Sequence, residues 1–146
     1  MIQLTTSLYQ GNKTDAEESV WQSAGITRIL RVSNPHIKER DFSPKGIDFL
    51  YLWVPFDDDG ETLTHAKLNT IYRFALLNPY DPLLVHCAAG QNRSIVTCAY
   101  LLCEVYNYTE DDAVKLILRK HNDLNVFESL VRKMKLLTNL NFRGLL

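Results

Sequence analysis

The chain has 146 residues, 46% of them hydrophobic and 23% charged, with a formal net charge of −1. This composition is that of an ordinary globular protein of one domain, with enough apolar residues to bury a core. The near-neutral charge argues against bulk binding to nucleic acid or to an anionic membrane. No apolar stretch approaches the roughly 18 residues of a membrane span, and the first residues lack the pattern of a signal peptide.

The three cysteines, Cys87, Cys98 and Cys103, cannot all pair within one chain, and none has the spacing of metal ligands. We therefore expect a reducing compartment, a cytoplasmic location, and neither a metal nor another cofactor. Cys98 and Cys103 lie in an apolar stretch and are interpreted as core residues, with a redox partnership with Cys87 as the alternative. The sequence does not indicate the oligomeric state.

The N-terminal half predicts strands that alternate with helices. One or two short edge strands are expected over residues 2–9, and the capping box that starts at Thr14 predicts a helix that continues to about residue 24 and ends at Gly25. Apolar runs predict strands over residues 26–32 and 47–55. The polar connection over residues 36–46 is either a place for substrate-specific contacts or a plain solvated loop.

The C-terminal half predicts one more strand and four helices. An amphipathic helix is expected over residues 64–78, then a strand over 83–86 and a very apolar, centrally buried helix over 94–106. Two further helices open near Thr109 and Asn125. Their predicted inward faces are Ala113, Leu116 and Ile117, and Phe127, Leu130, Val131, Met134 and Leu137. We interpret residues 1–146 as one α/β domain with a central, mostly parallel sheet flanked by helices, and residues 139–146 as a loose tail.

A helix joins the strand over 47–55 to the strand over 83–86, and this connection bears on function. Two strands joined in this way form a parallel pair whose carboxyl ends lie at the same edge of the sheet, where ligands bind in open α/β folds. Asp57, Asp58 and Asp59 follow the first strand, and Cys87 follows the second. We therefore expect the acidic loop to lie beside the cysteine.

The most informative stretch is residues 85–94, VHCAAGQNRS, in which Cys87 precedes Arg93 by six positions between an apolar strand and an apolar helix. Gly90 gives the conformational freedom that a tight concave loop requires, so that backbone N–H groups can turn inward. The loop ends at a helix N-terminus, where phosphate and thiolate are both favoured. Because Arg93 lies in the first helical turn with no acidic residue beside it, we expect an external anion there.

This arrangement predicts a cysteine-dependent phosphatase. A free cysteine is mostly protonated at pH 7, and the helix N-terminus, the loop amides and Arg93 would together favour the thiolate of Cys87 that attacks phosphorus. The hydroxyl of Ser94, if it reaches the sulfur, would steady the thiolate as it leaves. His86 either tunes Cys87 or is a hydrogen-bonded structural residue, and the sequence does not choose between the two.

The stretches LYQGN at 8–12, GITRIL at 25–30, LLVHCAAGQNRS at 83–94 and TEDDAVKLI at 109–117 follow one another in a characteristic order. In this order they resemble the dual-specificity branch of the protein tyrosine phosphatase superfamily, over nearly the whole chain. The loop at 85–94 is the specific signature, and the other stretches are supportive.

The resemblance implies a role for each residue of the loop. Cys87 would be the nucleophile, Ser94 the hydroxyl that assists departure of the thiolate, and Arg93 the side chain that holds phosphate. The loop backbone would complete the phosphate cradle at Ala88, Ala89, Gly90, Gln91 and Asn92. The stretch VPFDD at 54–58 places the family's general acid at Asp58, while the neighbouring Asp57 and Asp59 remain alternatives.

The implied function is hydrolysis of phosphotyrosine, phosphoserine and phosphothreonine in a phosphorylated protein, through a cysteinyl-phosphate intermediate. The loop differs from the family in lacking a basic or bulky residue beside Cys87, which argues against substrates with several phosphates, such as a phosphoinositide. The alternatives are removal of a 5′ phosphate from RNA, which asparagine before Arg93 allows by resemblance, a phosphoprotein-binding module without turnover, and a sulfur-transfer enzyme.

Overall fold

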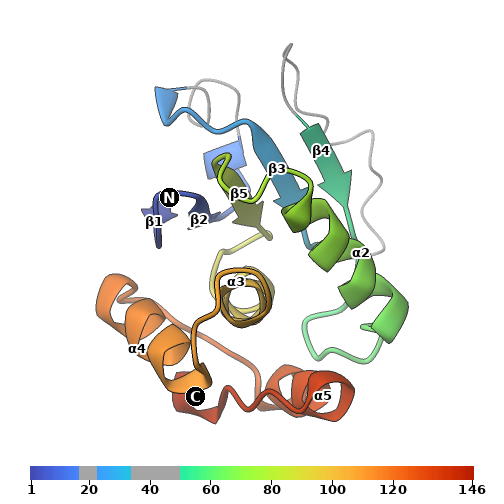
Figure 1. Ribbon diagram of the computed structural model, residues 1–146. Coiled ribbons are helices and arrows are strands. Elements are labelled where there is room, and N and C mark those ends of the chain that lie inside the picture. Colours follow the sequence, from blue (N-terminus) through green and yellow to red (C-terminus); the bar gives the residue numbers. More distant parts are fainter. Residues whose placement is uncertain (17–22, 34–49) are drawn as a thin grey trace.

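The computed structural model describes residues 1–16, 23–33 and 50–146, which form a five-stranded sheet with helices packed against it (Figure 1). The strands are β1 (Ile2–Gln3), β2 (Leu8–Gly11), β3 (Arg28–Arg31), β4 (Leu50–Trp53) and β5 (Leu83–His86). Their order is β1-β2-β5-β3-β4, and β1 alone runs antiparallel to its neighbour. The expected α/β fold with a mostly parallel sheet is confirmed.

The order of the strands differs from expectation in two places. We expected edge strands over residues 2–9, but β2 lies inside the sheet and pairs in parallel with β5, from Leu8 opposite Leu83 to Gly11 opposite His86. β4 and β5 are parallel as expected but are not neighbours, because β3 pairs with both. Since β2, β5, β3 and β4 all run in one direction, their carboxyl ends still share one edge.

Four helices follow residue 63, as expected. They are α2 (His65–Leu76), α3 (Arg93–Glu104), α4 (Glu110–Lys120) and α5 (Glu128–Thr138). Thr64 and Thr109 cap α2 and α4, since each side chain accepts a hydrogen bond from a backbone N–H three residues on. The helix expected from Thr14 begins as the 3-10 helix η1 (Thr14–Ala16), and most of its remainder and the polar connection over 36–46 lie outside the described residues. In the described part of the chain, no helix has the length and apolar character that crossing a membrane requires.

Helix α3 lies at the centre of the molecule, seen end-on in Figure 1, with the strands on one side and α4 and α5 on the other. Because it is covered all round, every residue from 93 to 102 is buried, as its apolar sequence predicts. Cys98 is fully buried and Cys103 half-buried, and both are unpaired. Burial raises the pKa of Cys98 and raises that of Cys103 to about 11, so both stay thiols near neutral pH and are poor redox partners for Cys87.

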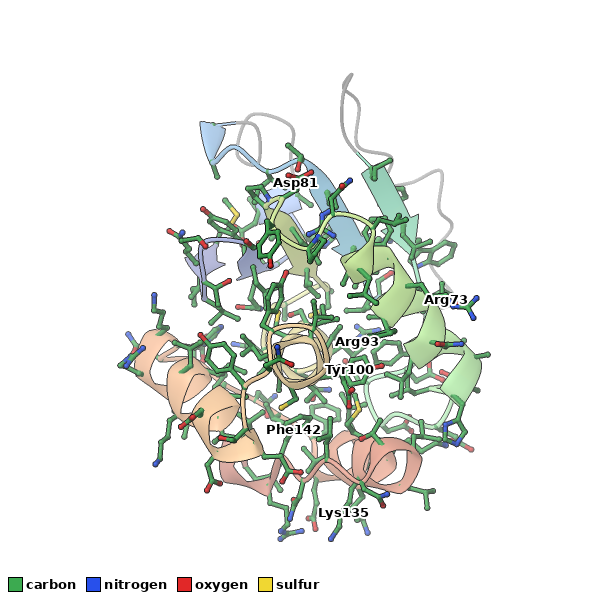
Figure 2. The ribbon with its side chains drawn as sticks, in the orientation of Figure 1. Arg73, Asp81, Arg93, Tyr100, Lys135 and Phe142 are labelled. Atoms are coloured by element: carbon green, nitrogen blue, oxygen red, sulfur yellow. The ribbon has the colours of Figure 1, made fainter. Side chains whose placement is uncertain are left out.

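The last residues are packed, which corrects the expectation of a loose tail over 139–146. Asn139 ends α5 with a left-handed backbone (φ 65°), and the chain turns so that the 3-10 helix η3 (Arg143–Leu145) packs on α4. Phe142 and Leu145 are buried, and Figure 2 shows Phe142 in the space between α3 and the last two helices. The apolar residues of this segment follow neither helical nor strand periodicity, so their sequence does not reveal that they complete the core.

Candidate active site

The loop that follows β5 reaches α3 through a sharp turn held close to the end of β2. Gly90 has a φ of +73°, and a Cβ at this position would lie 3.0 Å from the carbonyl oxygen of Gly11. Both the backbone conformation and the space therefore require glycine, as we expected. The backbone N–H of Lys13 donates to the carbonyl oxygen of Ala88 at 3.0 Å, which fixes the loop to the segment after β2.

A pocket of about 130 Å³ lies over this loop. Three segments supply its walls: the acidic loop after β4, the signature loop itself, and the stretch before α5. The lining residues are Asp58, Cys87, Ala88, Ala89, Gln91, Asn92, Arg93, Asn125 and Phe127. The expectation that the acidic loop lies beside the cysteine is therefore confirmed. Ser94 is buried behind the sulfur, with its Oγ 3.1 Å from Sγ of Cys87.

Arg93 is the first residue of α3, and its side chain is 6% exposed. Its Nη1 donates to the carbonyl oxygen of Phe56 at 3.0 Å, and its Nε lies 2.8 Å from Oδ1 of Asp58. Figure 2 shows Arg93 beside α3, inside the molecule. The anion at Arg93 in this structure is thus a carboxylate of the chain itself, with which an incoming phosphate would compete.

The structure distinguishes the three consecutive acids of the loop after β4. Asp58 contacts Arg93 and lines the pocket. The carboxylate of Asp59 accepts from the backbone N–H of Glu61 at 2.9 Å, within its own turn. Asp57 begins that turn, since its carbonyl oxygen accepts from the N–H of Gly60, which has a φ of +81°. Of the three, only Asp58 lines the pocket that contains Cys87.

Asn92 joins the three walls of the pocket. It is 5% exposed, and both ends of its side-chain amide are used. Nδ2 donates to the carbonyl oxygen of Asp58 at 2.8 Å, and Oδ1 accepts from the backbone N–H of Phe127 at 2.9 Å. The side chain of Asn92 thus holds the acidic loop and the start of α5 against the signature loop.

Phe127 corrects a prediction, because we expected its side chain to face the core with Leu130, Val131 and Met134. It is 38% exposed and lines the pocket instead. α5 begins only at Glu128, so Phe127 precedes the helix and does not share its periodicity. Its aromatic ring gives the pocket an apolar wall.

Sequence reasoning also missed Gln10, for which the one available signal is a glutamine within an otherwise apolar strand. It is buried under the signature loop, where its Nε2 donates to the carbonyl oxygen of Gly90 and to Oγ of Ser94, both at 2.8 Å.

His86 is a buried residue whose ring contacts the backbone of the signature loop. It is 2% exposed, and its Nδ1 lies 3.3 Å from the carbonyl oxygen of Cys87. Burial is the main cause that lowers the pKa of His86 to about 4, so the ring is neutral near pH 7. Because a carbonyl oxygen can only accept, Nδ1 carries the ring proton. These observations favour the structural interpretation of His86.

The family model for the dual specificity phosphatase catalytic domain matches residues 8–141. The chain belongs to the dual specificity phosphatase family. Human dual specificity protein phosphatase 9 is 31% identical over 129 residues, which make up 85% of this chain and 32% of that protein. This dual specificity phosphatase chain therefore spans about a third of the length of its curated relative. The expected class of cysteine-dependent phosphatase agrees with the family.

Two solved structures illustrate the shared fold of this dual specificity phosphatase. Human DUSP28 is similar with a TM-score of 0.78 and 20% identity, over 95% of this chain and 96% of that chain. PTPMT1 in complex with PI(5)P is similar with a TM-score of 0.70 and 17% identity, over 92% of each chain. At these identities the likeness concerns the fold alone.

Proposed function

We propose that this dual specificity phosphatase hydrolyses phosphotyrosine, phosphoserine and phosphothreonine esters of proteins through a covalent phosphate on Cys87. The observation that supports the proposal is the pocket in which Cys87, Arg93 and Asp58 meet. A nucleophile, a cation for the phosphoryl oxygens and a proton donor are the three groups that such a reaction requires.

In the first step, the thiolate of Cys87 attacks phosphorus in line with the leaving oxygen, so that an S–P bond forms as the P–O bond breaks. Arg93 and the backbone N–H groups of residues 88–93 hold the other three oxygens as charge develops. Asp58, in its protonated form, gives its proton to the departing oxygen. A serine or threonine alkoxide is a poorer leaving group than a tyrosine phenoxide, and so gains more from that proton.

In the second step, the carboxylate of Asp58 takes a proton from water, and the oxygen of that water attacks the phosphorus of the cysteinyl phosphate. The S–P bond breaks, inorganic phosphate is released and the sulfur becomes a thiolate again. The hydroxyl of Ser94, 3.1 Å from the sulfur, donates a hydrogen bond to the thiolate as it forms.

The charges of the pocket bear on the class of substrate. Among the described residues that line the pocket, Arg93 alone is basic, which suits a single phosphoryl group. This favours a phosphorylated protein over ligands with several phosphates. The asparagine that suggested an RNA substrate, Asn92, has its amide engaged by Asp58 and Phe127, which gives it a structural role. The absence of nucleic-acid and membrane partners and the cytoplasmic location remain predictions.

The test is hydrolysis of p-nitrophenyl phosphate and of phosphotyrosine, phosphoserine and phosphothreonine peptides, with PI(5)P and 5′-phosphorylated RNA as competing substrate classes. Cys87→Ser is expected to abolish turnover, and Asp58→Ala to lower kcat by roughly 10²–10⁴. Asp57→Ala and Asp59→Ala are the matched controls, with kcat within a few-fold of wild type. Rapid acid quenching should trap phosphate on Cys87. Turnover that survives in Cys87→Ser would refute the covalent mechanism, and phosphopeptide binding without turnover by wild type would indicate a binding module.

A further inference from the structure

Gln10 is a buried amide directly beneath the signature loop, and the mechanism above gives it no role. It is 1% exposed, at a position of β2 that pairs with Val85 of β5. Its Nε2 lies 2.8 Å from the carbonyl oxygen of Gly90, 2.8 Å from Oγ of Ser94 and 3.3 Å from the carbonyl oxygen of Gly11. A buried amide is tolerated when its hydrogen bonds are made, and here the two shortest are made to the signature loop.

The two carbonyl oxygens determine which end of the Gln10 amide faces the loop. A carbonyl oxygen accepts and cannot donate, so the NH₂ end must face Gly90 and Gly11. This group has two hydrogens, and its two nearest acceptors are the carbonyl oxygen of Gly90 and Oγ of Ser94, each at 2.8 Å. The serine oxygen is therefore an acceptor of this bond. The hydroxyl hydrogen of Ser94 is left for a different partner.

Two acceptors lie near that hydrogen: the sulfur of Cys87 at 3.1 Å and the carbonyl oxygen of Gly11 at 3.4 Å from Oγ. The sulfur is nearer and, as a thiolate, carries a full charge, which makes it the stronger acceptor. We propose that Gln10 is a positioning residue that acts through Ser94, because it holds the serine hydroxyl as a hydrogen-bond donor toward the sulfur of Cys87. The inference rests on the proposed roles of Cys87 and Ser94.

The test measures the sulfur directly, by the rate of alkylation of Cys87 with iodoacetamide as a function of pH. Mass spectrometry locates the adduct, because the chain also contains Cys98 and Cys103. A hydrogen bond to a charged group favours the charged form, and only the part of this effect that depends on orientation is lost in Gln10→Leu. We therefore expect the half-maximal pH of alkylation to rise by about half to one unit. Gln3→Leu, the same change on the exposed edge strand β1, is the matched control and should leave it unchanged.

A double-mutant cycle separates action through Ser94 from a general distortion of the loop. Ser94→Ala should raise the half-maximal pH at least as far as Gln10→Leu, and the double variant should match Ser94→Ala. A Gln10→Leu shift that persists in full when Ser94 is replaced would overturn the proposal, as would no shift in Gln10→Leu. Breakdown of the cysteinyl phosphate in single-turnover experiments should slow in the same pattern.

A second variant, Gln10→Met, keeps the side chain neutral and nearly the same length but removes the amide donor, so the serine hydrogen is no longer directed toward the sulfur. Its shift should match that of Gln10→Leu, and no shift would overturn the proposal. It also replaces Gln10→Leu in the cycle if that variant fails to fold, as judged by circular dichroism. A chain that shows the expected alkylation pattern but hydrolyses no phosphate ester would contradict the proposed function and leave the assignment of Gln10 standing.

Discussion

Removal of the Asp58 carboxylate is predicted to strengthen the binding of oxyanions while it lowers turnover. Oδ1 of Asp58 lies 2.8 Å from Nε of Arg93, the guanidinium to which a phosphate would bind in the proposed mechanism. The carboxylate therefore competes with an entering anion for Arg93, and its negative charge also repels that anion. Both effects disappear in Asp58→Ala.

The size of this effect follows from the exposure of the two partners. The side chain of Asp58 is 50% exposed, whereas that of Arg93 is 6% exposed. Because water reaches the carboxylate, the pair is screened, and we assign it the range of exposed ion pairs, roughly 0.2–1 kcal/mol. At about 1.4 kcal/mol per tenfold change, the dissociation constant of an oxyanion should fall roughly 1.5- to 5-fold.

The assay is the inhibition constant of phosphate or tungstate, measured against p-nitrophenyl phosphate, or isothermal titration calorimetry where turnover is too slow. Asp57→Ala and Asp59→Ala serve as controls, because neither residue lines the pocket. The gain in affinity should shrink at high ionic strength. Unchanged or weaker oxyanion binding in Asp58→Ala would refute the competition between this carboxylate and phosphate for Arg93.

Three further predictions concern buried residues. Asn92→Ala loses two hydrogen bonds, so the free energy of unfolding in urea should fall by about 2 kcal/mol. Because the acidic loop then loses its anchor, kcat should fall more for alkyl than for aryl phosphates. Equal losses of kcat for the two kinds of ester would count against the role of Asn92 in holding that loop. Because burial lowers the pKa of His86 to about 4 from its ordinary 6.5, the unfolded state takes up the proton first. The contribution of neutral His86 to stability is fully present above about pH 6.5 and declines by up to about 3 kcal/mol as the pH falls toward 4. In urea titrations across this range, the free energy of unfolding of His86→Asn should therefore depend less on pH than that of wild type. An equal dependence on pH in the two proteins would contradict this prediction. Phe142→Ala should lower the free energy of unfolding by about 3–5 kcal/mol. The control Arg143→Ala removes an exposed ion pair and should lower it by about 1 kcal/mol at most. Similar small losses in both variants would mean that residues 139–146 do not stabilise the fold.

Local signals in the sequence predict most of the helices and strands, because each depends on residues that are close together in the chain. Thr64 and Thr109 cap the helices that follow them, and the fully apolar stretch of α3 corresponds to a helix buried on all sides. The order of the strands does not have such a local signal. Leu8 pairs with Leu83, and no pattern within either segment specifies this partner. Phe142 is likewise buried in a core cluster that distant segments build, and no pattern in its own segment indicates this.

In the candidate site, too, the sequence predicts what depends on neighbouring residues and misses what depends on contacts between distant segments. The signature loop is contiguous, so the sequence predicts its turn at Gly90 and the helix that begins at Arg93. The three acids are chemically alike, and only the turn of the backbone places Asp58 against Arg93. Gln10 and Phe127 reach the site from distant segments, which periodicity along the chain cannot reveal.

The interior position of β2 has a consequence for the order of events during synthesis. This strand leaves the ribosome before β3, β4 and α2, whereas its partner β5 emerges only after them. Parallel pairing between such distant segments is slow, since a long stretch of chain must close before any contact forms. Translation products that stop before β5 contain Gln10 but lack Cys87 and the strand that pairs with Gln10, so a prematurely terminated chain should be inert.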